Sequence, residues 1–109
     1  NSSSLVFAGQ RGYIPVSANF VAPWSVATHW PTYSKAALDA GRTPDAANWR
    51  VARSVYVADT DAEAEAFVKQ PGGPYDYYYE YLFHIFDRSH YRIAVVVNKG
   101  DDPKQLTHQ

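Results

Sequence analysis

Two segments with the pattern of short β-strands are separated by a helical stretch, and this order restricts the fold more than any other sequence feature. The first segment is YIPVSA, residues 13–18, and the second is WRVARSVYVA, residues 49–58. Between them, residues 23–40 have helical spacing and end at Gly41. A strand, a helix and a second strand in this order form a βαβ unit, whose strands run parallel. The chain is therefore expected to have an α/β fold.

Helices are also expected outside this unit. Residues 4–11 place apolar side chains on one face, and Gly12 follows in the position of a helix C-cap. Thr60 and Glu63 have the spacing of a capping box, which predicts a helix over residues 61–69. The alternation of strands and helices thus extends beyond a single βαβ unit.

The last third of the chain is expected to hold an aromatic helix and a strand. Residues 74–88 have a helical pattern and contain five of the nine tyrosines. YRIAVVV, residues 91–97, has the composition of a strand. No basic residue lies among the tyrosines from Tyr75 to Tyr81, so packing in a core or between subunits is favoured over stacking on RNA or sugars. Pro31, inside residues 23–40, is expected to kink that helix.

Composition excludes several classes of function. The chain has 109 residues, a net charge of −1 and no cysteine. Its basic residues are scattered, so nucleic acid is not an expected partner. No segment resembles a membrane span or a signal peptide, and a cytoplasmic location is expected. The four histidines lack metal-ligand spacing, and capping explains the acidic residues around Asp61, so no metal site is expected.

The opening residues NSSS leave two interpretations open. Asn1, Ser2, Ser3 and Ser4 precede an apolar helical run. Serine and asparagine are good N-caps and are common at mobile chain ends. A helix N-terminus that carries hydroxyl side chains is equally an anion site, commonly for phosphate. From these residues alone, simple capping is favoured.

Two long stretches resemble the bacterial luciferase-like, FMN-dependent monooxygenase family. NSSSLVFAGQRGYIPVS is similar to the family segment in which small hydroxyl residues end a barrel strand and a helix closing on QRG leads to the next strand. HWPTYSKAALDAGRTPDAANWRVARSVYVADTDAEAEAFV is similar to the run from that strand's helix through the next strand and into the helix after it. GPYDYYYEYL is similar to the segment that follows. The likeness covers about three quarters of the chain.

The resemblance implies a (β/α)₈ TIM barrel, a fold that needs roughly 250 residues. Residues 1–109 are therefore expected to be a single domain formed by part of the C-terminal half of such a barrel. A strand would then precede Asn1, and the missing initiator methionine fits processing, cloning or a fragment. The family's early strands are not represented, so no catalytic residue is assigned.

The resemblance also implies a flavin site. Asn1, Ser2, Ser3 and Ser4 would contact the FMN phosphate, while Ser17 and Asn19, at the end of a barrel strand, would lie beside the flavin ring. A plain strand-end turn is the alternative for the latter two residues, and His29 is expected to be a surface or packing residue.

The whole enzyme would use reduced FMN, delivered by a flavin reductase, and O₂ as co-substrate to oxidise a small apolar or aldehyde-like organic substrate. The fragment alone would be inactive. The alternative is a non-catalytic oligomerising module derived from such a barrel. A homo-oligomer is expected in both cases, because an open sheet edge recruits partners.

Overall fold

The computed structural model describes residues 2–90 and 99–105, except for the side chains of Ser2 and Pro103. The strand expected over residues 91–97 lies outside the described residues. The chain divides into two compact units, Asn1–Arg53 and Ser54–Gln109. The expectation of a single domain stays a prediction.

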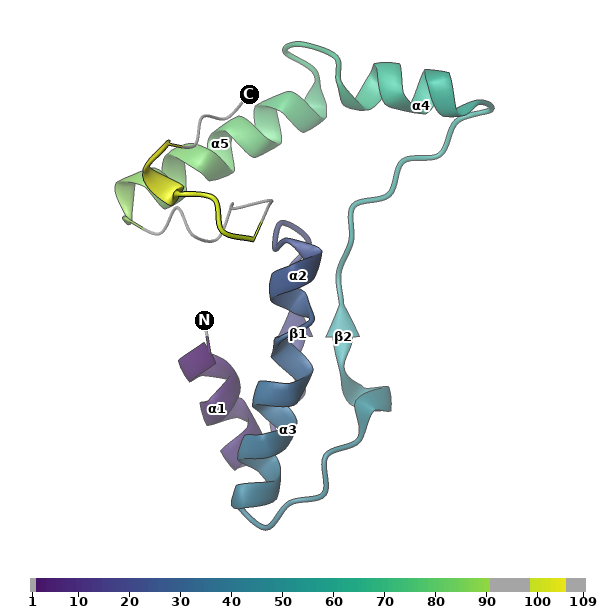
Figure 1. The fold of residues 1–109 in the computed structure, drawn as a ribbon. Helices are drawn as coiled ribbons and strands as arrows, with labels where there is room; N and C mark the ends of the chain where they lie inside the picture. Colours follow the sequence, from purple (N-terminus) through teal and green to yellow (C-terminus); the bar gives the residue numbers. More distant parts are fainter. Residues whose placement is uncertain (1, 91–98, 106–109) are drawn as a thin grey trace. The chain divides into compact units, whose positions relative to one another are not determined.

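The first unit contains a parallel βαβ arrangement, as the sequence predicts. Its two-stranded sheet pairs Val16 with Arg50 and Ser17 with Val51. Helices lie beside this sheet (Figure 1). In chain order the elements are α1 (Ser2–Arg11), β1 (Val16–Ser17), α2 (Pro23–Val26), α3 (His29–Asp39), the short 3₁₀ helix η1 (Ala46–Asn48) and β2 (Arg50–Val51). This is a partial α/β fold, and the parallel pairing of the two predicted strands is confirmed.

Both strands are shorter than expected, and most of residues 49–58, expected as a strand, is exposed and outside the sheet. Pairing is confined to the residues near Ser17, whose carbonyl accepts from the amide of Ala52 at 2.9 Å. Beyond this bond the chain has no ladder partner among the described residues, and Val55 and Val57 are 76% and 82% exposed. Pro15 takes part in this pairing through its carbonyl, which accepts from Arg50 N at 3.0 Å. The pairing does not use the backbone N–H that proline lacks.

The predicted kink at Pro31 does not occur, because the helical stretch breaks earlier. α2 ends at Val26, α3 begins at His29, and the chain turns between them. Thr28 stabilises the turn by donating its hydroxyl to the carbonyl of Ser25 at 2.7 Å. Pro31 therefore falls in the first turn of α3, where a backbone N–H has no partner within the helix and proline is tolerated.

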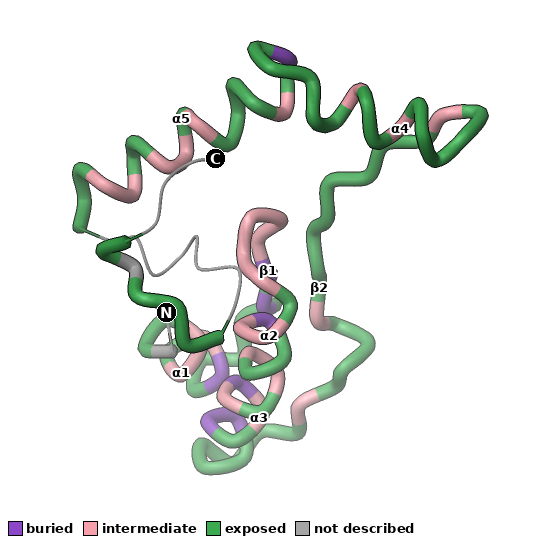
Figure 2. The backbone as a smooth tube through the Cα atoms, turned by 45° about the horizontal axis from the view of Figure 1, so that its top comes forward, coloured by how far each residue is buried: buried purple, intermediate pink, exposed green. Residues whose placement is uncertain are grey.

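α1 packs directly against α3 through small residues, and this contact forms much of the first unit's core (Figure 2). Gly9 is buried, and a Cβ at this position would lie 2.5 Å from the carbonyl oxygen of Tyr33 and 3.1 Å from the Cβ of Ala36. Ala37 is only 1% exposed. Tyr33 donates its hydroxyl to the carbonyl of Tyr13 at 2.9 Å and so joins α3 to the segment before β1.

The second unit confirms the two predicted helices. They are α4 (Asp61–Val68) and α5 (Pro74–Arg88), and a short 3₁₀ helix, η3, covers Pro103–Gln105. The capping box is complete: Glu63 N donates to Thr60 Oγ1 at 3.2 Å, and Thr60 N donates to Glu63 Oε2 at 3.0 Å.

Aromatic contacts tie α4 to α5. Phe67 stacks on Tyr56 with 4.2 Å between the ring centroids, and both rings meet Tyr75 edge-on. The remaining tyrosines of α5 are exposed: Tyr77, Tyr78, Tyr79 and Tyr81. The described part of this unit has no buried large side chain, so its helices are held by local contacts.

Candidate functional site

The carboxyl ends of β1 and β2 lie at one end of the first unit, and α1 begins at the same end (Figure 1). In parallel α/β folds, binding sites form at this end of the strands. The segment 17–19, predicted from the sequence to lie beside a flavin, is therefore at the appropriate end of the sheet.

Ser17 is the centre of a buried hydrogen-bond network at the end of β1. The residue is 1% exposed. Trp49 donates its indole Nε1–H to Ser17 Oγ at 2.9 Å, and the same Oγ lies 2.9 Å from His29 Nδ1. These bonds join β1 to the start of α3 and to the residue before β2. Both partners of the Ser17 hydroxyl therefore lie on the side of the sheet on which α3 lies.

His29 is half-buried, and burial lowers the pKa of its imidazole below the ordinary value. The neutral ring is therefore favoured at neutral pH. Ser17 Oγ accepts from Trp49, and its own proton can be donated to His29 Nδ1 in the tautomer that carries the imidazole proton on Nε2. The expected packing role of His29 thus takes the form of a specific hydrogen bond.

Arg53, two residues after β2, holds the turn that follows β1. Arg53 Nη1 donates to the carbonyl of Val21 at 2.9 Å and to the carbonyl of Asn19 at 3.3 Å. Asn19, one of the predicted flavin neighbours, is half-buried in this turn. Sequence reasoning did not single out Trp49 or Arg53, although both lie in the WRVAR stretch that carries part of the family resemblance.

The serines predicted to contact phosphate lie in the first turn of α1. The helix starts at Ser2, two residues earlier than expected, so these serines form its first turn and do not precede it. Ser3 and Ser4 are exposed, and this turn contains no acidic residue. Exposed first-turn N–H groups and hydroxyls without a competing carboxylate suit an anion. Asn1 lies outside the described residues.

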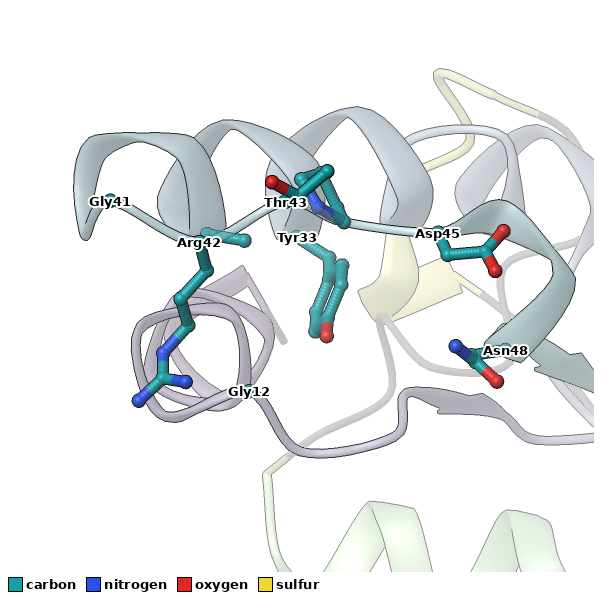
Figure 3. A pocket seen from close by; sticks show the side chains of 9 residues that line it. Gly12, Tyr33, Gly41, Arg42, Thr43, Asp45 and Asn48 are labelled. Carbon is teal, nitrogen blue, oxygen red and sulfur yellow. The ribbon is translucent and has the colours of Figure 1, made fainter.

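A pocket of about 430 Å³ lies at the opposite end of the first unit (Figure 3). It contains none of the predicted site residues, and its lining comes from α3, the turn after α3 and the segments that precede β1 and β2. Arg42 lies at its edge and donates from Nε to the carbonyl of Gln10 at 2.9 Å, at the end of α1. The full lining is Gly12, Tyr33, Ala37, Gly41, Arg42, Thr43, Pro44, Asp45 and Asn48.

Neither a cluster of metal ligands nor a membrane-spanning helix is present in the part of the chain that the structure describes. Its histidine, aspartate and glutamate side chains form no group of three or more that could hold a metal ion. None of its helices combines the length and apolar character needed to cross a membrane.

Comparisons with known proteins show which enzymes the chain is similar to. The chain is 39% identical over 104 residues to a 3,6-diketocamphane 1,6-monooxygenase of Pseudomonas putida, and 36% identical over 108 residues to a 2,5-diketocamphane 1,2-monooxygenase of the same organism. These matches cover 94% and 97% of the chain. The chain spans only 27% and 29% of the length of these relatives. No protein-family profile matches it.

A solved structure agrees with the sequence matches. The oxygenating constituent of 3,6-diketocamphane monooxygenase from Pseudomonas putida, a type II Baeyer–Villiger monooxygenase in complex with FMN, superposes on 95% of the chain. The TM-score is 0.71 and the identity 37%, over 28% of that protein. These relatives are FMN-dependent, luciferase-like monooxygenases, the family that the sequence resemblance implied. Within that class, the homologues of the chain are camphor monooxygenases of the type II Baeyer–Villiger kind.

Proposed function

We propose that the chain forms part of an FMN-dependent monooxygenase that inserts oxygen into a small cyclic ketone. The observation that carries the proposal is the agreement of 95% of the chain, at 37% identity, with an oxygenating subunit that binds FMN. The names of the relatives indicate that the substrate is a bicyclic diketone. This is a more specific class than the small apolar or aldehyde-like substrate expected from the sequence.

The start of α1 is proposed to hold the FMN phosphate. Asn1, Ser2, Ser3 and Ser4 would supply side-chain donors, together with the first N–H groups of the helix. The exposed hydroxyls and the lack of acidic side chains in this turn fit a doubly charged group. The positive end of the α1 dipole adds a favourable interaction with the same charge.

The end of β1 is proposed to border the flavin ring at Ser17 and Asn19. The Ser17 hydroxyl is already bonded to His29 and Trp49 and the residue is almost fully buried, so Ser17 would support this border while Asn19 lies closer to the ring. The half-buried turn at Asn19 would form one wall of a pocket that excludes water. Other walls of that pocket would come from parts of the barrel outside this chain.

The proposed reaction converts a ketone, O₂ and reduced FMN into a lactone, water and oxidised FMN. One atom of O₂ enters the carbon–carbon bond next to the ketone carbonyl, and the other leaves as water. When bound, reduced FMN supplies the two electrons and activates O₂. A flavin reductase would return the cofactor to its reduced state. The residues of this chain bind and orient the cofactor, while the catalytic residue is not assigned. A cytoplasmic location and a homo-oligomer stay predictions.

The test is a turnover assay on the protein that contains this chain within a complete barrel. With a bicyclic diketone, O₂, FMN, an added flavin reductase and NADH as the reductant for that reductase, we expect a lactone that is heavier than the ketone by one oxygen atom. Omission of the reductase is the matched control and should abolish the product. Absence of the lactone, combined with absence of FMN binding by the same protein, would contradict the proposal.

A further inference from the structure

We propose that Arg53 is a positioning residue that fixes the turn after β1 in the shape the cofactor site needs. The turn covers residues 18–22 and contains Asn19. This inference rests on the proposed function, because it concerns the wall of the same site. It assigns a task to a side chain that lies two residues after β2, far from the turn in sequence.

The contacts of Arg53 bridge two distant parts of the chain. Its Nη1 group carries two hydrogens, and the carbonyl oxygens of Asn19 and Val21 lie 3.3 and 2.9 Å away. These acceptors are 34 and 32 residues from Arg53 in sequence. Arg53 Nη1 therefore donates to two carbonyls of the turn and links the turn to the segment that follows β2.

The turn has little regular structure of its own. The amide of Val21 donates to the carbonyl of Ala18 over 3.4 Å, which is long for a hydrogen bond. Carbonyls in irregular backbone require partners from outside the segment, and charged donors make stronger bonds than neutral ones. Arg53 supplies such a donor, so the conformation of residues 19–21 depends on it.

The start of the turn is fixed independently. Ser17 is held by Trp49 and His29 through its buried hydroxyl. The turn is therefore restrained on the α3 side at its start and from β2 at its middle. A binding wall restrained at two points loses less conformational entropy when a ligand docks, which favours affinity.

The first experiment measures the turn itself, without cofactor, in the 109-residue chain. In the unaltered chain, backbone ¹⁵N order parameters of residues 19–22 should be near those of a rigid backbone, about 0.85. In Arg53→Met they should fall below about 0.6, while those of α1 and α3 stay unchanged. Arg50→Met is the matched control, because Arg50 lies three residues before Arg53 and donates instead to the carbonyl of Ala47. Unchanged order in the turn of Arg53→Met would overturn the inference.

The second experiment measures FMN affinity in the complete barrel protein. Arg53→Met should weaken FMN binding by about tenfold, which corresponds to about 1.4 kcal/mol, and Arg50→Met should leave it unchanged. Arg53→Lys retains the charge but has a shorter side chain without the planar fork, so it should restore little of the affinity. Full recovery with lysine would indicate direct attraction of the phosphate and would overturn the positioning role.

The two proposals can fail separately. If the unaltered barrel protein does not bind FMN, the proposed function fails. If it binds FMN and Arg53→Met binds equally well, only the inference about Arg53 fails.

Discussion

Trp49 donates its indole N–H to the buried hydroxyl of Ser17 across 2.9 Å, and this bond links the residue before β2 to the last residue of β1. The indole also stacks on Trp30 of α3, with 6.0 Å between the ring centroids. The side chain thus fixes the register of the two strands and the distance of α3 from them.

Replacement of Trp49 by phenylalanine should destabilise the first unit. The variant keeps an aromatic ring beside Trp30 but leaves the hydroxyl of Ser17 without its indole donor. Loss of one buried hydrogen bond costs about 1 kcal/mol. Urea unfolding followed by tryptophan fluorescence measures this, because all three tryptophans precede Arg53 in the sequence. Tyr13→Phe removes an exposed hydroxyl and is the control. Equal stability of the two variants would show that the bond is unimportant.

Substitution of Gly9 by alanine should separate α1 from α3. The new Cβ would lie 2.5 Å from the backbone carbonyl of Tyr33, so a helix must move. Overpacking of this kind costs about 1–3 kcal/mol, which outweighs the better helix propensity of alanine. Gln10→Ala, on an exposed position of the same helix, should change the stability by less than about 0.5 kcal/mol. An unfolding midpoint that is the same in Gly9→Ala as in the native chain would contradict the close packing.

The stability of the first unit should fall as the pH drops below the ordinary pKa of histidine. Burial lowers the pKa of His29, so near that pKa the unfolded chain binds a proton that the folded chain does not. The free energy of unfolding therefore decreases as the pH falls towards the lowered pKa and levels off below it. Urea midpoints between about pH 5 and pH 8 measure this effect. His29→Gln should flatten the profile, whereas His84→Gln, at an exposed site on α5, should not.

The chain should associate in solution. Tyr77 and Tyr81 of α5 are 68% and 56% exposed, and Val55 and Val57 are more exposed still. Large apolar side chains exposed together favour a partner surface. Light scattering at micromolar concentration should give the mass of a dimer or a larger oligomer. A stable monomer that does not aggregate at that concentration would count against this prediction.

Local patterns predicted the elements well because their causes are local. The Thr60 and Glu63 capping box, Pro74 at the start of α5 and the positive φ of Gly12 all follow from nearby residues. The parallel pairing of β1 and β2 was also predictable, since a helical stretch between two strand patterns leaves few other arrangements.

The parts that sequence reasoning missed depend on contacts between distant residues. The bond from Trp49 to Ser17 spans 32 positions, and no short pattern reports it. The extent of β2 was overestimated because alternation indicates a strand but does not supply the neighbouring strand that would pair with it. A kink was expected at Pro31, whereas the helical stretch breaks before α3, in a turn that Thr28 stabilises.

The central claim is that the start of α1 binds the phosphate of FMN, and one titration tests it most directly. In the complete barrel protein, Ser4→Ala should weaken FMN binding by about tenfold, as expected for one lost phosphate hydrogen bond. The 109-residue chain alone should show no measurable affinity at micromolar FMN, because it spans less than a third of its relatives and lacks the other walls of the site. An unchanged dissociation constant in Ser4→Ala would contradict the account and leave Ser2, Ser3 and Ser4 as the capped first turn of a helix.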